Sequence, residues 1–248
     1  MESHHAKSNS KEKQFKHYMF DFFMLFLAVT LGFFVENMRE HLVENSREKD
    51  YVHSLAEDIK QDISQLDTII HQRNEKDKQM DSLLELLNYT DPNEHGKDIY
   101  YFARWVPRTY RFYPNDETIQ QLNSGNWRLI KNRKVIDALL SYNRLVRSLS
   151  VYIEQREESL ILIMYPTMDK LFDNRVFQKM KNGLSFDRPV DNPKLLSTDK
   201  PIINEFGNEV HFIQNANYYF INNSTLLVNN ARKTLDIIKK EYQLEDSR

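Results

Sequence analysis

The feature that most constrains this chain is an apolar run near its N-terminus, which reads YMFDFFMLFLAVTLGFFV from Tyr18 to Val35. As a helix that rises about 1.5 Å per residue, this run measures roughly 27 Å, close to the hydrocarbon thickness of a bilayer. Asp21 is its one charged residue, and charged residues flank it on both sides. We therefore predict a transmembrane anchor over residues 17–37, in contact with membrane lipid.

The charges around the run indicate how the chain is oriented. A cleaved signal peptide is the alternative for such a run, but no pair of small residues suited to cleavage follows it. Four lysines precede the run and three basic residues follow closely, and basic residues favour the cytoplasmic side. We predict a single-pass protein of a bacterial inner membrane, with residues 1–16 as a cytoplasmic tail and the bulk of the chain in the periplasm.

One face of the predicted anchor carries an unusual set of residues. Asp21, Ala28 and Gly32 lie within about 20° of one line on a helix. Ala28 and Gly32 are small residues four apart, which lets a second helix approach closely, whether from another membrane protein or from a second copy. A carboxylate in lipid is costly unless it reaches a partner, water or the interface. Asp21 therefore either snorkels to the headgroups or belongs to a helix-packing face, where it is paired or titrates.

The chain beyond the anchor reads as one long helix. No Gly or Pro occurs between Gly32 and Pro92, and apolar residues recur at steps of three and four. We predict a membrane-proximal helix over residues 38–90, ending near Asn88. Charged residues interrupt its apolar stripe between Arg73 and Lys78, which predicts a bend or a more exposed stretch there.

Residues 91–248 are predicted to complete a helical periplasmic bundle. Helices are expected from Asp98 to Val106, from Asn115 or Asp116 to Gly125, from Asn132 to Pro166, where a kink or an end is expected, and from Ile202 or Asn208 to Leu244. A loop with short helical turns is expected between Asp173 and Pro201. The fold class is therefore all-α, with an N-terminal transmembrane helix that continues into a long helix of an antiparallel bundle.

Two apolar segments are expected to lie in the core of this bundle. The run LILIMY, residues 160–165, is too short to span a bilayer and is interpreted as buried. The last helix is rich in Asn, a poor helix former, so packing must stabilise it. The residues expected to pack are Phe212, Ala216, Tyr219, Phe220, Leu226, Leu227 and Leu235.

Composition excludes several functions. The net charge of −2 gives no basic excess for nucleic acid. The absence of cysteine excludes thiol catalysis, disulfides and cysteine-ligated zinc. The motifs of phosphate-binding loops, dinucleotide sites, zinc proteases and serine hydrolases are absent, and no histidine lies at a recognised ligand spacing in the body of the chain. We therefore predict no catalytic, cofactor or metal site, and no enzyme.

An aromatic and basic passage from Tyr100 to Pro114 is the one candidate ligand site. The residues singled out are Tyr101, Arg104, Trp105, Arg108, Tyr110 and Arg111. Aromatic rings interleaved with arginines can stack on bases or sugars. The alternative is a connector that lines the core, in which the arginines cover aromatic faces and pair with acids.

Two passages, FDFFMLFLAVTLGFFVENMREHLVE (Phe20 to Glu44) and TIQQLNSGNWRLIKNRKVIDALLSY (Thr118 to Tyr142), carry a resemblance. Together they resemble an uncharacterised family of small single-span membrane proteins from Bacteroidota. The resemblance extends loosely over most of the chain and implies an inner-membrane protein with a helical domain. It implies no activity and no site residues.

These observations favour a membrane-anchored interaction or scaffold protein of the cell envelope. Two other functions stay open at this point. A periplasmic bundle could sense or bind a ligand, although a tail of 16 residues is too short to be an output domain. The chain could also be an accessory subunit of an ion-driven envelope complex that uses Asp21.

Overall fold

The structure is a computed structural model that describes residues 6–152, 156–183 and 185–244. It confirms the predicted all-α class, with one small hairpin as the strand content of the described residues. The chain divides into two units, one up to Tyr51 and the other from Val52 onward. Helix α1 contributes to both.

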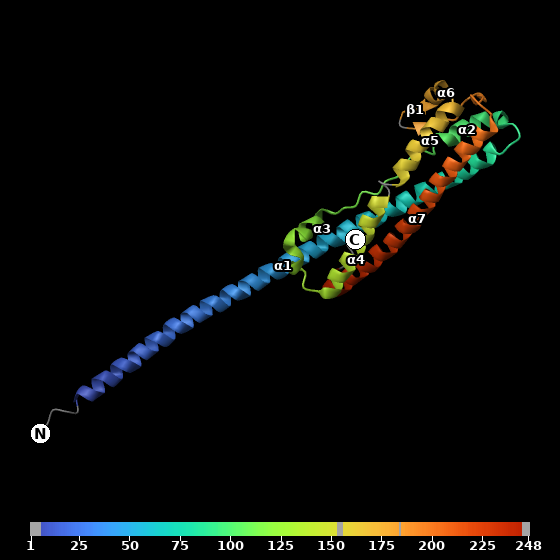
Figure 1. The fold of residues 1–248 in the computed structure, drawn as a ribbon. Coiled ribbons are helices and arrows are strands. Elements are labelled where there is room, and N and C mark those ends of the chain that lie inside the picture. Colours follow the sequence, from blue (N-terminus) through green and yellow to red (C-terminus); the bar gives the residue numbers. More distant parts are fainter. Residues whose placement is uncertain (1–5, 153–155, 184, 245–248) are drawn as a thin grey trace. The chain divides into compact units, whose positions relative to one another are not determined.

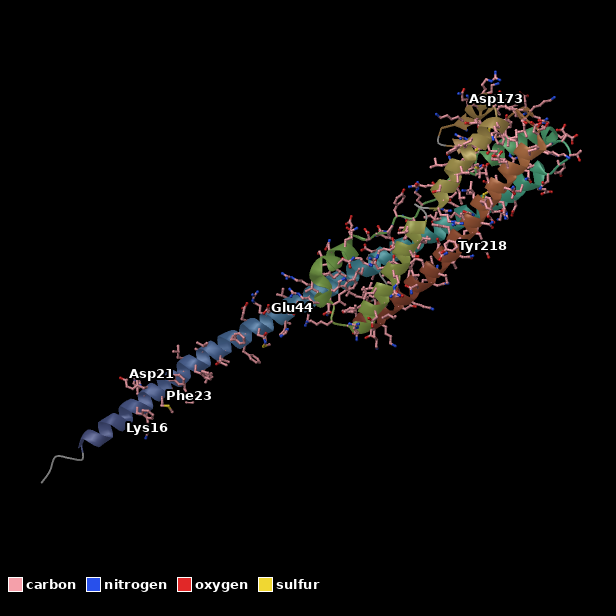
Figure 2. All side chains as sticks on the ribbon, viewed as in Figure 1. Lys16, Asp21, Phe23, Glu44, Asp173 and Tyr218 are labelled. Carbon is pink, nitrogen blue, oxygen red and sulfur yellow. The ribbon has the colours of Figure 1, made fainter. Side chains whose placement is uncertain are left out.

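Helix α1 (Ala6–Leu87) is one helix of 82 residues, which confirms that the predicted anchor continues into the predicted membrane-proximal helix. Within the first unit every residue from 15 to 43 is exposed. Figure 2 shows Asp21 and Phe23 projecting from this part of α1. Its most apolar window has a mean hydropathy of 2.0, with none of it buried. By length and composition α1 can therefore cross a membrane.

The second unit is a bundle built from four helical segments: the part of α1 after Val52, α4 (Arg133–Tyr152), α5 (Glu158–Leu171) and α7 (Lys200–Tyr242). Helix α7 lies alongside α4 and α5 (Figure 1). Helix α7 runs antiparallel to α1, because its later residue Arg232 pairs with Asp67 and its earlier residue Gln214 donates a hydrogen bond to Asp81. The bundle is therefore antiparallel, as the sequence predicts.

Short elements connect these helices. They are the 3-10 turn η1 (Pro92–His95), α2 (Gly96–Ala103), α3 (Glu117–Gln121), the π turn η2 (Leu122–Asn126), the 3-10 turn η3 (Trp127–Leu129), α6 (Asn174–Lys179), β1 (Lys181–Asn182) and β2 (Ser185–Phe186). At the start of α2, a Cβ on Gly96 would lie 1.9 Å from the carbonyl oxygen of Pro193. Only glycine fits there, so this residue fixes how the loop before α7 packs on α2.

The helical run predicted from Asn132 to Pro166 corresponds to α4 and α5, and residues 153–155 between them lie outside the described residues. Of the kink or end expected at Pro166, the end is not observed, because Pro166 lies inside α5, which continues to Leu171. A proline removes the hydrogen bond to the carbonyl four residues earlier. That carbonyl belongs to Leu162, whose side chain is exposed, so water can donate a hydrogen bond to this carbonyl.

The prediction that residues 160–165 are buried is half wrong. Ile161 and Met164 are buried, but Leu162 and Ile163 are 66% and 62% exposed. Neighbours on one side of a helix cover positions three and four apart. A run of six apolar residues therefore cannot be buried all around by the bundle on one side of α5.

An aromatic core holds the connecting segments together at one end of the bundle. Tyr100 of α2 is fully buried, and its ring lies 5.1 Å from that of Phe172, which in turn lies 5.4 Å from Phe206 of α7. The Tyr100 hydroxyl donates to the carbonyl of Lys194 and accepts from the backbone N–H of Asp173. This packing fixes α2 and therefore the position of the segment that follows it.

Candidate functional site

A buried ion cluster occupies the stretch of α1 where the apolar stripe is interrupted. Arg73 and Lys76 are 0% and 1% exposed, so the prediction of a more exposed stretch is wrong for these two residues, and α1 continues through them as one helix. Arg73 donates from Nη1 and Nη2 to the two carboxylate oxygens of Glu157, at 3.0 and 2.9 Å. Lys76 Nζ lies 3.9 Å from the same carboxylate. Glu157 supplies the negative charge that lets two cations enter the core.

Further contacts complete this cluster. Arg73 Nη1 also donates to the side-chain oxygen of Asn217, and the Arg73 guanidinium lies 3.7 Å from the ring centre of Phe220. Burial lowers the pKa of Lys76 from 10.5 to about 8, against the opposing effect of Glu157. The cluster thus joins α1, α7 and the residue that precedes α5.

The same two cations hold the backbone of the aromatic and basic passage. Lys76 Nζ donates to the carbonyl of Arg108 at 2.6 Å. Arg73 donates from Nε and Nη2 to the carbonyl of Tyr110, at 3.1 and 2.7 Å. The backbone of the passage is therefore held from its inner side by buried charge.

Four of the six predicted ligand residues gather around one ring. The hairpin residue Phe186 packs against Tyr101 and Trp105, with ring centres 6.1 and 4.6 Å away. Arg108 stacks on Trp105 and Phe186, and Arg104 lies over the edge of the same group at 5.9 Å from Phe186. The structure thus brings these four residues together with Phe186.

The other two predicted residues do not join this group. Tyr110 contributes its backbone carbonyl to Arg73. The Arg111 guanidinium pairs with Glu158 at the start of α5. Pairing of Arg111 with an acid is what the interpretation of the passage as a connector predicts.

A small pocket opens beside the four clustered residues, and we call it the basic pocket. It has a volume of about 300 Å³. The basic, hydroxyl-bearing and aromatic residues that line it are Arg104, Arg108, Lys181, Tyr165, Ser185 and Phe186. No acidic side chain is among the described residues that line it. Sequence reasoning missed Lys181, Ser185 and Phe186, because they come from a hairpin of two-residue strands that has no detectable pattern.

Helix α7 presents an unexpected outer surface. Phe212, Tyr219 and Leu226 are 56%, 48% and 60% exposed, so the prediction that they pack is wrong. Ala216, Phe220, Leu227 and Leu235 are buried as predicted. We call the exposed stripe of α7 its outer face; it consists of Phe212, Asn215, Tyr218, Tyr219, Asn222, Thr225, Leu226 and Asn229. Tyr218 is labelled in Figure 2.

The predicted packing face of the anchor is exposed within the first unit. Ala28 and Gly32 are exposed, and nothing lies within 4 Å of a Cβ built on Gly32. Asp21 Oδ2 lies 3.8 Å from Nε2 of His17, one turn earlier, and both side chains are exposed. This face can therefore accept a partner helix without rearrangement of its own side chains.

No family model matches the chain, and no curated protein or solved structure matches it either.

Proposed function

We propose that the protein is a membrane-anchored interaction protein of the cell envelope, without catalytic activity, whose bundle associates with a second copy through the outer face of α7. One observation carries this proposal. The 20 residues from Phe212 to Ala231 contain no Asp, Glu, Lys or Arg, in a chain of which 28% is charged. Several of them are exposed aromatic or aliphatic side chains. Depletion of charge with enrichment of aromatic residues distinguishes interface cores from ordinary surface.

The spacing of the outer face supports a helix as the partner. Phe212, Tyr219 and Leu226 are seven residues apart, and so are Asn215, Asn222 and Asn229. The two series are offset by three residues, which is the a and d arrangement of a coiled coil. At about 1.5 Å per residue the charge-free segment extends for roughly 30 Å.

The chemistry of this face supports a second copy as that helix. An Asn side chain both donates and accepts, so it pairs with another Asn. Copies anchored in one membrane leave it on the same side, and parallel helices in register place each residue against its own counterpart. A charge would then meet a like charge, and the outer face has none from Phe212 to Asn229. Confinement to a membrane also raises the effective concentration of the copies.

The anchor is proposed to take part in the same association. Its face of Asp21, Ala28 and Gly32 allows close approach of a second transmembrane helix. We place the protein in the inner membrane of a bacterium, with the bundle in the periplasm, as its charge distribution and its resemblance to the Bacteroidota family favour.

Cysteine crosslinking tests this proposal, because the natural chain contains no cysteine. Asn222→Cys, in native membranes under mild oxidation, should give a disulfide-linked homodimer. Ser64→Cys, at an exposed position of α1, is the matched control and should stay monomeric. A product containing a different protein, or equal dimer from both variants, would contradict self-association through α7.

A second variant tests the role of missing charge. Asn222→Glu places two carboxylates against each other in the proposed dimer and should shift the protein to monomer, as measured by native mass spectrometry from detergent. Glu is a better helix former than Asn, so α7 itself should be unaffected. Ser64→Glu adds the same charge elsewhere and should leave the dimer intact.

A further inference from the structure

We propose that the basic pocket binds a small phosphate ester. The pocket lies between the segment after α2, helix α5 and the β1–β2 hairpin, and it shares no residue with α7. Binding here is therefore independent of association through the outer face. Three cationic side chains, from Arg104, Arg108 and Lys181, meet in a volume of about 300 Å³. The hydroxyls of Tyr165 and Ser185 complete the polar lining.

The arginines of this pocket are oriented by aromatic rings. The Arg108 guanidinium lies 4.9 Å from the ring centre of Trp105 and 5.1 Å from that of Phe186. The Arg104 guanidinium lies 5.6 Å from Phe177 and 5.9 Å from Phe186. Stacking covers the faces of a guanidinium, and at Arg104 it leaves the N–H edge to bind an oxyanion.

Neighbouring arginines are already neutralised, whereas Arg104 is not. Arg111 pairs with Glu158, and Arg188 pairs with Asp98. The side chain of Arg104 forms no ion pair or hydrogen bond with the described part of the chain, and the same holds for Lys181. Like charges brought close together repel, so a counter-ion from outside the chain would stabilise this arrangement.

The backbone behind the pocket is rigidly held. The carbonyl of Arg108 accepts from Lys76 at 2.6 Å, and that of Tyr110 accepts from Arg73 at 2.7 Å. Both cations are fully buried and are balanced by Glu157. A site whose backbone is fixed before binding loses less entropy when the ligand arrives. The buried cluster thus has a consequence for binding: it positions Arg108.

Charge and size together select the ligand. The exposed guanidinium of Arg104 matches the oxygens of a phosphate group, and Arg108 and Lys181 add positive charge against its two negative charges. A volume of about 300 Å³ is at the lower limit for ligand pockets, which suits a phosphate group on a three-carbon or sugar-sized body. Phe186 and Tyr165 offer an apolar wall for that body.

The test uses the full chain in phosphatidylcholine nanodiscs. The chain has two tryptophans, so Trp127→Phe leaves Trp105, beside the pocket, as the one fluorescent reporter. Titration with glycerol 3-phosphate at constant ionic strength should give a saturable change in emission, and isothermal titration calorimetry should give the same affinity. Glycerol should give none. Absence of saturable binding by both methods would overturn the proposal.

Substitutions locate the binding. Arg104→Gln and Lys181→Gln change exposed side chains and should each weaken glycerol 3-phosphate binding about tenfold or more. Arg147→Gln removes an exposed charge from α4, outside the pocket, and should leave the affinity unchanged. Equal weakening by all three would mean general charge attraction and would refute a site.

Adding phosphatidic acid to the nanodiscs distinguishes two sources of the phosphate. If phosphatidic acid leaves the affinity for glycerol 3-phosphate unchanged, the ligand is a soluble ester. If phosphatidic acid instead competes with glycerol 3-phosphate, and Arg104→Gln abolishes this competition, the pocket recognises the same phosphate chemistry with a lipid headgroup as its source.

Discussion

Arg73 of α1 and Glu157, 84 residues later in the chain, form a two-pronged ion pair in the interior of the bundle, with both N–O distances close to 3 Å. The pair holds α1 to the residue that precedes α5, and Lys76 approaches the same carboxylate. One carboxylate therefore balances two buried cations, and the association of these segments depends on a single side chain.

Glu157→Gln should destabilise the bundle strongly. Both buried cations would lose their counter-ion, and removal of one partner of a buried pair costs about 3–5 kcal/mol of the free energy of unfolding. Urea unfolding followed by circular dichroism measures this loss. Glu158→Gln is the control, since its ion pair with Arg111 is about 40% exposed and should contribute less than about 1 kcal/mol. Equal effects of the two substitutions would refute the role of the cluster.

The stability contributed by Lys76 should rise with pH above 8. Burial lowers the pKa of Lys76 from 10.5 to about 8, so between these values the unfolded chain binds more protons than the folded one. Stability then increases with pH, and the full penalty for the buried charge applies below pH 8. Relative to Lys76→Met, the natural chain should gain about 2 kcal/mol between pH 7.5 and 9.5.

Urea unfolding at several pH values measures that gain. Lys78→Met, which removes an exposed lysine of the same helix, should show no comparable change. A difference between the natural chain and Lys76→Met that stays constant with pH would mean that Lys76 is not buried as a charged group.

The proposed topology predicts different labelling of two engineered cysteines. Ser64→Cys lies in the bundle part of α1 and Ser8→Cys lies before the anchor. With the bundle in the periplasm, a membrane-impermeant maleimide added to spheroplasts should label Ser64→Cys and should label Ser8→Cys only after lysis. The reverse pattern would place the bundle in the cytoplasm.

Gly32→Leu should weaken association through the anchor without preventing insertion. A leucine fills the space that a close partner helix requires, while it makes the span more apolar. Thr30→Leu lies on the opposite face, about 160–180° away, and is the matched control. Crosslinking in membranes measures the dimer. If both variants form as much dimer as the natural chain, the anchor face takes no part in association.

Asp21→Asn separates the two interpretations of the anchor carboxylate. A side chain that only snorkels should tolerate the loss of charge, whereas a paired or titrating one should not. The same crosslinking assay in membranes distinguishes them.

The positions of the helices could be predicted well because they depend on local information. The end of α1 at Leu87 and the span of α7 from Lys200 to Tyr242 lie within a few residues of the predicted bounds. Helical periodicity, prolines and glycines carry that information along the chain. The sequence could not decide between a kink and an end at Pro166, because whether a proline ends a helix depends on what surrounds the carbonyl it leaves without a partner.

The candidate sites could be predicted only in part. Arg104 and Arg108 stood out by composition, but the hairpin that supplies Lys181 and Phe186 comes from about 75 residues further along the chain. Neither segment contains a sequence pattern that indicates contact with the other. Their meeting is a property of how α2, α5 and α6 pack.

The sequence by itself determined the apolar anchor, the long helices and the all-α class, because these follow from residues close together in the chain. The tertiary structure alone decided which stripe of α7 faces inward. Phe206, Ile213 and Phe220 form one apolar stripe, and Phe212, Tyr219 and Leu226 form another. The first is buried and the second is exposed. The tertiary structure also decided the burial of Arg73 and Lys76. Their charge predicts exposure, but both are buried because Glu157 lies beside them. Whether a side chain is buried depends on the residues that pack against it, and those residues are distant in the sequence.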